Sequence, residues 1–346
     1  MDIILLIALA LAGFYMAWNI GANDLSNAMG TSVGSKALTL KQVIVLAAIF
    51  ELAGALLFGG NVTGTIAKGI VPLDTIAAIN PTIVAVGMLA AILAAAFWIT
   101  CATFYKLPVS TTHSLVGAVA GFGIISIFYG YIGTSDIQWF ELVKIAGSWI
   151  VSPVLGASVA YLAFFVVRKL FLKKAEEVAG VEKKFVWLQI ATACLMAFAH
   201  GSNDVSNAIG PLYAVYSIYG YDGFGPFGLT TALLLLGGVG IVIGLATWGY
   251  KVIDTVGTKI TELTPTRGFS AEFATASVVL ANSFIGLPVS TTHTLIGSVI
   301  GVGLAGGISS VNLSVIKNIV KTWFITVPIA ALTSMIIFVP LAWFFM

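Results

Sequence analysis

The chain has 346 residues, of which 59% are apolar and only 9% carry charge. A soluble domain has roughly one quarter of its residues charged, so this composition excludes an ordinary soluble protein and favours one that lies in a lipid bilayer. The formal net charge is only +2, and we expect no nucleic-acid partner. The two cysteines, Cys101 and Cys194, lie in apolar runs without metal-ligand spacing and are interpreted as small buried side chains.

In chain order, apolar runs recur along the whole length, from residues 3–23 to residues 322–346. A helix needs roughly 20 apolar residues to cross about 30 Å of hydrocarbon, and several runs are long enough to turn back or break inside the membrane. We therefore predict an all-α integral membrane protein with about 10 to 12 membrane segments, some of them broken or re-entrant. The first run lacks a basic start and a cleavage pattern, which indicates a retained helix rather than a secretory signal.

Two motifs occur twice with the same offset. Residues 21–30 read GANDLSNAMG and residues 201–210 read GSNDVSNAIG, while residues 107–117 read LPVSTTHSLVG and residues 287–297 read LPVSTTHTLIG. Both pairs are separated by 180 residues. The chain is therefore predicted to consist of two homologous repeats, at residues 1–167 and 185–346.

The segment between the repeats, residues 168–184, holds nine of the thirty charged residues and has a basic excess. Basic connectors beside apolar spans mark the cytoplasmic side of a cell membrane, plasma or bacterial inner. If each repeat crosses the membrane an odd number of times, the second repeat is inverted and both chain ends lie outside. Inverted repeats place their substrate site near the bilayer midplane, where we expect the duplicated motifs to meet.

The first duplicated motif places carboxylate and amide groups directly after an apolar run. Its members are Asn23, Asp24 and Asn27 in the first repeat and Asn203, Asp204 and Asn207 in the second. An aspartate at membrane depth costs roughly 2.5 to 3.5 kcal/mol, so it is a functional candidate. Neither motif contains Lys or Arg, and oxygen ligands suit a hard cation such as sodium. The alternative is that these side chains cap the start of a helix.

The second motif contributes hydroxyl groups after a proline. Its members are Ser110, Thr111 and Thr112 in the first repeat and Ser290, Thr291 and Thr292 in the second. A helix that begins at such a motif leaves backbone N–H groups free for an anion, and six hydroxyls from two facing half-helices could surround a tetrahedral oxyanion. Alternatively, these hydroxyls bond to their own helix or to packed helices.

Three further residues are candidates for coupling, whereas a fourth, His200, is not. His113 and His293 directly follow the hydroxyl runs and could carry protons or only orient the loop. Glu51 is the only charge in its apolar run, and its equivalent in the second repeat is Thr231, so any role would be asymmetric. His200 aligns with Ile20 and is therefore interpreted as structural.

The two Asn and Asp motifs together with the two PVSTTH blocks closely resemble the inorganic phosphate transporter family, often called PiT. The resemblance spans both repeats, and it implies phosphate as substrate, symport with sodium in many members or with protons in some, and a homodimer. Phosphate would then be bound by both hydroxyl runs with Asn27, Asn207 and the two aspartates. Sodium would be bound by the two aspartates with Asn23, Asn203, Ser110 and Ser290.

Alternating access of the two repeats around a central site would move the substrate. A carrier of the same architecture for sulfate or another oxyanion, or one driven by protons, is the alternative function. An intramembrane enzyme is a remote alternative, because no nucleophile with an adjacent base is evident.

Overall fold

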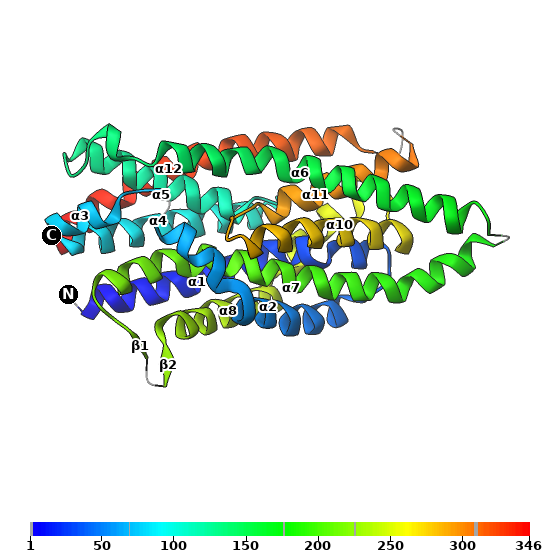
Figure 1. The fold of residues 1–346 in the computed structure, drawn as a ribbon, viewed down its shortest axis with the longest axis horizontal. Coiled ribbons are helices and arrows are strands. Elements are labelled where there is room, and N and C mark those ends of the chain that lie inside the picture. Colours follow the sequence, from blue (N-terminus) through cyan, green and yellow to red (C-terminus); the bar gives the residue numbers. More distant parts are fainter. Residues whose placement is uncertain (1–2, 69, 176, 225, 308–310) are drawn as a thin grey trace.

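The computed structural model describes residues 3–68, 70–175, 177–224, 226–307 and 311–346, and Figure 1 shows its fold. The regular structure of these residues is almost entirely helical, as predicted. The α-helices are α1 (Ile3–Gly34), α2 (Leu40–Lys68), α3 (Leu73–Ile79), α4 (Pro81–Phe104), α5 (Thr111–Phe128), α6 (Trp139–Val167), α7 (Val178–Ile218), α8 (Leu229–Trp248), α9 (Tyr250–Thr258), α10 (Pro265–Phe284), α11 (Thr291–Gly306) and α12 (Leu313–Phe345). Short elements are the 3-10 turn η1 (Thr134–Asp136), the π-turn η2 (Arg168–Leu172) and the ribbon of β1 (Gly223–Phe224) with β2 (Phe227–Gly228).

Eight helices of the described chain are long and apolar enough to cross a membrane. They are α1, α2, α4, α5, α6, α7, α8 and α12, with α6 continuing into η2. Helices α10 and α11 pair with each other as α4 and α5 do. Together with the eight spanning helices of the described chain they give ten membrane segments, the lower end of the predicted range of 10 to 12.

Two of the helix pairs are re-entrant hairpins that enter from opposite ends of the molecule (Figure 1). Helices α4 and α5 form the first hairpin on the end where both termini lie, and α10 and α11 form the second on the end where η2 meets α7. The turns fall at residues 105–110 and 285–290, where the duplicated hydroxyl motif lies. The breaks in the membrane helices therefore occur at this motif, whereas the Asn and Asp motifs lie inside the continuous helices α1 and α7.

The local sequence explains how each hairpin turns. Lys106 and Gly286, which are equivalent under the 180-residue offset, both have a positive φ, of 59° and 71°. In this left-handed conformation the next amide, that of Leu107 or Leu287, donates back five residues to a carbonyl of the first arm, which ends that helix. The proline that follows cannot extend the helix, and a serine then caps the second arm.

The helices pack across the two repeats. Helix α2 lies along α7, α1 lies along α8, α6 packs against α10 and α11, and α12 packs against α4 and α5. Glycine permits the closest of these approaches: a Cβ at Gly21 would lie 2.0 Å from the Ile241 carbonyl oxygen, and one at Gly201 would lie 2.1 Å from that of Glu51. Both duplicated glycines therefore bring the helices that carry the aspartates against their neighbours.

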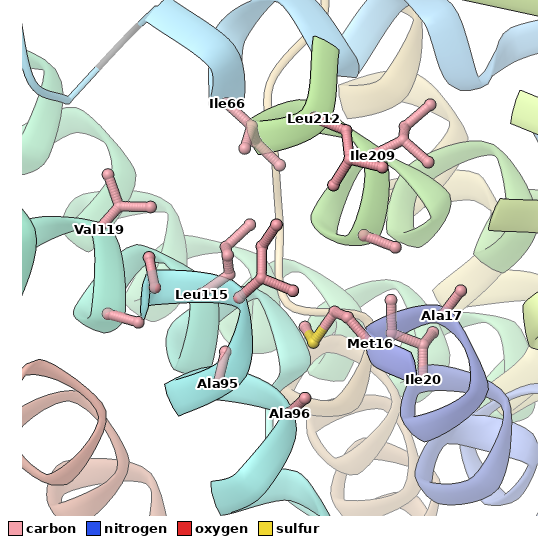
Figure 2. Packing of buried hydrophobic residues seen from close by; sticks show 14 of the residues in the cluster. Met16, Ala17, Ile20, Ile66, Ala95, Ala96, Leu115, Val119, Ile209 and Leu212 are labelled. Carbon is pink, nitrogen blue, oxygen red and sulfur yellow. The ribbon is translucent and has the colours of Figure 1, made fainter. Parts of the chain in front are cut away.

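An apolar cluster separates the centre of the molecule from the end that carries the termini. Figure 2 shows side chains of α1, α4, α5, α7 and α2 meeting there, among them Met16, Ile20, Leu115 and Leu212. Along α1, α5 and α7 these residues lie on the terminal side of the duplicated polar motifs. The polar centre is therefore closed toward that end by packed hydrocarbon.

Candidate functional site

The tips of the two hairpins meet at the centre of the protein. Thr112 Oγ1 donates to the Val289 carbonyl at 3.2 Å, and Thr292 Oγ1 donates to the Val109 carbonyl at 3.1 Å. These two bonds are related by the repeat, since each threonine reaches the backbone of the opposite tip. The hydroxyl motifs of both repeats therefore form one continuous lining.

The Asn and Asp motifs of α1 and α7 face this lining. Asn27 Nδ2 donates to Asp24 Oδ1 at 2.7 Å and also to Thr292 Oγ1 of the second hairpin at 2.7 Å. Asn207 Nδ2 lies 3.2 Å from Asp204 Oδ1 and 3.1 Å from Thr112 Oγ1 of the first hairpin. Because both motifs lie within helices, the alternative that they cap a helix start does not apply.

The remaining threonines bind the aspartates of their own repeat. Thr111 Oγ1 donates to Asp24 Oδ2 at 3.0 Å, and Thr291 Oγ1 donates to Asp204 Oδ2 at 2.6 Å. None of the twelve side chains of the two duplicated motifs predicted to bind phosphate or sodium is more than 2% exposed. The four segments therefore meet in one buried site that both repeats build.

Some of these side chains hold the hairpin tips in place. The Asn23 amide donates to Thr103 Oγ1 and to the Leu107 carbonyl, and its oxygen accepts from the Val109 amide. Asn203 makes the equivalent contacts in the second repeat. Ser110 and Ser290 cap α5 and α11 by accepting from the amides three residues further on. In this conformation the four side chains position the site, and their outer lone pairs and hydroxyl protons remain for ligands.

Several polar groups in the site have no partner among the described residues. The amides at the first two positions of α5 and of α11 make no hydrogen bond, and such N–H groups at a helix N-terminus favour an anion. The side-chain oxygens of Asn27 and Asn207 are buried and also unpaired. These oxygens suit a cation or the hydroxyl of a protonated oxyanion. The site thus offers donors and acceptors for ligands of both signs.

The alignment of His200 with Ile20 suggested a structural role, but the His200 ring lies among the carboxylates of the site. Its Nε2 lies 2.9 Å from Asp204 Oδ2 and 3.7 Å from Asp24 Oδ2, and its Nδ1 lies 3.3 Å from Glu51 Oε1. The ring is fully buried. His200 is therefore the partner that sequence reasoning did not find for the two aspartates. Only its position directly before Gly201, where the second Asn and Asp motif begins, could have suggested this.

Glu51 completes a group of three carboxylates around this imidazole. It is buried, and apart from the His200 contact neither of its oxygens accepts a hydrogen bond from a described residue. No Lys or Arg occurs among the buried residues that the structure describes. One imidazole can balance at most one of the three negative charges, so the group needs protons or bound cations. Asp24, Asp204 and His200 also lie close enough together to share one ion.

The two other histidines lie side by side behind the hairpin tips. The ring centroids of His113 and His293 are 4.1 Å apart. His113 is tilted against Trp149 at 3.8 Å, and His293 stacks on Trp323 at 3.5 Å. His293 Nδ1 lies 3.4 Å from the Trp149 carbonyl. Neither ring contacts an aspartate of the site among the described residues. This arrangement favours the interpretation that the two imidazoles orient the hairpin tips.

A fourth buried carboxylate, Glu272 on α10, was not singled out from the sequence. It accepts hydrogen bonds from Ser32 at 2.6 Å, Thr192 at 2.9 Å and Thr31, and Gln189 Nε2 lies 3.5 Å away. Thr31 is seven residues beyond Asp24 on α1, which is roughly 10 Å along a helix axis. The hydroxyl cluster around Glu272 therefore extends the polar site toward the linker end, opposite the apolar cluster of Figure 2.

Comparisons with known proteins identify the family. The model of the phosphate transporter family matches residues 20–334, which include most of each repeat and all four motifs. A protein of Pyrococcus furiosus named as a phosphate permease is 41% identical, with 97% of this chain and 96% of that protein aligned. The chloroplastic inorganic phosphate transporter 2-1 of Arabidopsis thaliana is 38% identical over 95% of this chain and 71% of its own length.

A solved structure agrees with both the sequence comparison and the fold. The structure described as the sodium-dependent phosphate transporter superposes with a TM-score of 0.86 at 36% identity, and the match covers 98% of this chain and 99% of that one. These relatives are transporters rather than enzymes. Together with the buried site that both repeats build, these matches show that this chain is a membrane protein of the phosphate transporter family.

Proposed function

We propose that this protein carries inorganic phosphate across the membrane by symport with sodium, through alternating access to the central site. The observation that supports this most directly is the crossed pair of contacts, Asn27 with Thr292 and Asn207 with Thr112. Each contact joins one repeat to the hairpin of the other. A ligand bound there would contact both repeats, so its binding could shift the conformation of the whole carrier.

Phosphate would be bound by neutral donors. The free amides lie at the starts of α5 and α11, beside Thr112 and Thr292, and the hydroxyls of these threonines would exchange their bonds to the Val289 and Val109 carbonyls for bonds to phosphate oxygens. Helix dipoles add attraction for negative charge at both N-termini. Binding thus would release one tip from the other, which gives the ligand a physical effect on the hairpins.

Cations would be required for phosphate to bind. Asp24, Asp204 and Glu51 already outnumber the single imidazole of His200, and phosphate adds further negative charge in a poor solvent. Sodium bound by the aspartates, with Asn23, Asn203, Ser110 and Ser290 as further oxygen donors, would neutralise this excess. By linkage, sodium then raises the affinity for phosphate and phosphate raises that for sodium equally.

The same charges favour phosphate over sulfate. Monobasic phosphate carries protons and can donate to an aspartate or to the unpaired oxygens of Asn27 and Asn207. Sulfate has no proton at neutral pH and would meet only repulsion from the carboxylates. Proton-driven phosphate transport and sulfate transport are the alternatives that the experiment must separate.

Sodium-driven uptake of radiolabelled phosphate into proteoliposomes tests the proposal. We expect accumulation against the phosphate gradient that stops when choline replaces sodium, and little competition by sulfate. Uptake that follows a proton gradient and ignores sodium would reject sodium coupling, and equal competition by sulfate would reject the selectivity. Asp24→Asn and Asp204→Asn variants that kept full sodium dependence would exclude the aspartates as the coupling groups.

Three further features belong to the proposal. We place the linker at residues 168–184 in the cytoplasm and both termini outside, because the linker is basic and the termini lie together at the opposite end (Figure 1). Residues 1–167 and 185–346 would be the two repeats that exchange access. The functional unit would be a homodimer in the cell membrane, and crosslinking in native membranes tests that state.

A further inference from the structure

A charged cavity lies at the linker end of the molecule, away from the central site. Its volume is 430 Å³. It is formed where the end of α6 and η2 meets the start of α7, the segment before α10 and the end of α11. The cavity therefore lies between the connection of the two repeats and the base of the second hairpin.

Three basic residues line this cavity, and none of them forms an ion pair with a described residue: Arg168, Lys173 and Arg267. Arg168 Nη1 donates to the Ala305 carbonyl at 2.9 Å, and Arg267 Nη1 donates to the Glu262 carbonyl at 2.7 Å. A guanidinium has five N–H donors, so each arginine is held in place by one bond and keeps others for a ligand.

The acidic residues of the cavity leave it with a single excess positive charge. Glu182 and Glu262 line it beside the three basic residues. Both carboxylate oxygens of Glu182 accept from Thr266, at 2.9 Å from its amide and 2.8 Å from its hydroxyl. Glu182 is therefore occupied in fixing the start of α10. The net charge of +1 suits a monoanion better than a multiply charged one.

One wall of the cavity is apolar and leads to the lipid-facing side of α6. Phe164 and Leu172 line the cavity, and the Arg267 guanidinium lies over the Phe164 ring at 5.6 Å. Near Phe164 on the same helix, Leu162, Phe165 and Val166 are 61%, 48% and 48% exposed. A ligand with a charged head and hydrocarbon chains could place the head among the basic groups and the chains along this face.

We propose that this cavity binds a monoanionic phosphate group, which is that of a phospholipid headgroup or of free inorganic phosphate. The apolar wall and the net charge favour the phosphodiester of an anionic lipid. Such a ligand would join η2 to the base of α10 and α11, and would therefore restrain how the second hairpin moves relative to the connection between the repeats. This site is separate from the central one.

Native mass spectrometry of the purified full chain with phosphatidylglycerol, and with phosphatidylcholine for comparison, tests the lipid source. We expect one phosphatidylglycerol to stay bound and its affinity to fall about tenfold in Arg267→Gln, the effect of losing one charge-assisted hydrogen bond. Lys173→Gln removes a charge that forms no hydrogen bond or ion pair with a described residue, so it is expected to weaken binding without affecting folding. The matched controls are Lys317→Gln and Lys321→Gln on α12, which do not line the cavity.

Equilibrium dialysis with radiolabelled phosphate tests the other source. A bound phosphate that disappears in Arg267→Gln and Lys173→Gln, whether or not another phosphate stays bound to the chain, would identify free phosphate as the ligand. The proposal is overturned if neither probe distinguishes these variants from the native chain, or if the α12 controls lose binding equally. Because both measurements are of binding alone, a failure of sodium-coupled transport would not affect them.

Discussion

Replacing His200 by glutamine tests how the buried carboxylates are balanced. The His200 imidazole lies 2.9 Å from Asp204 and 3.3 Å from Glu51, and if the ring is protonated each contact is worth about 5 kcal/mol before desolvation at an effective dielectric constant of about 20. Most of this attraction offsets the free-energy cost of desolvating the buried ring. Removing one partner of a buried ion pair typically costs about 3 to 5 kcal/mol. The lower value corresponds to about a hundredfold change in an equilibrium constant.

The loss should appear in phosphate binding, because glutamine leaves the three carboxylates without a cationic side chain. We expect the phosphate affinity of His200→Gln to fall about a hundredfold, while its sodium affinity rises. Removing one negative charge as well, in the double variant with Glu51→Gln, should recover about tenfold of the phosphate affinity. Scintillation proximity binding of phosphate over a sodium titration measures both quantities.

A control for folding is Ser126→Ala, whose buried hydroxyl donates only within its own helix, to the Phe122 carbonyl at 2.8 Å. If His200→Gln binds phosphate within about twofold of the native chain, the imidazole does not balance the carboxylates. Failure of the Glu51→Gln double variant to recover any affinity would show that charge balance is not the cause of the loss.

Three other substitutions test other parts of the site. Thr292→Val removes the bonds from Asn27 and to the opposite tip, and we expect phosphate uptake to fall about tenfold with unchanged expression in membranes. Gly21→Ala would place its Cβ 2.0 Å from the Ile241 carbonyl oxygen, so membrane-inserted protein should fall sharply, whereas Gly64→Ala, with no atom within 4 Å, should not change it on an immunoblot. Glu272→Gln keeps the shape of the hydroxyl cluster but removes its charge, and we expect the sodium concentration for half-maximal uptake to rise; an unchanged value would exclude Glu272 from coupling.

The duplicated parts of the site could be predicted from the sequence for a physical reason. A proline followed by a capping serine marks the start of the second helix of such a turn, and this order is visible in both hydroxyl motifs, whereas the left-handed conformation of Lys106 is not. An aspartate among apolar residues is equally visible, because its cost in the bilayer has to be compensated. The meeting of these motifs followed from their repetition, and the structure confirms a mostly helical membrane fold with re-entrant segments.

The groups that sequence reasoning missed are those that have no equivalent in the other repeat. His200 aligns with Ile20, and Glu272 aligns with Ile92. Comparison of the repeats therefore argued against a functional role for His200 and gave no reason to single out Glu272. The length of α10 was also hidden, because Arg267 and Glu272 interrupt its apolar pattern. Only the three-dimensional packing shows that α10 carries Glu272 inward, against residues of α1 and α7.

The site thus combines a symmetric frame with asymmetric charges. The amides, hydroxyls and aspartates proposed to face the substrate occur in both repeats, so the frame would present similar contacts to phosphate when access changes from one side to the other. His200 lies nearer to Asp204 than to its equivalent Asp24, as the distances of 2.9 and 3.7 Å from the imidazole show. The two aspartates therefore experience different fields although their local sequences match. Two cation positions built on them would differ in affinity, and such a difference would let cations bind in a fixed order before phosphate.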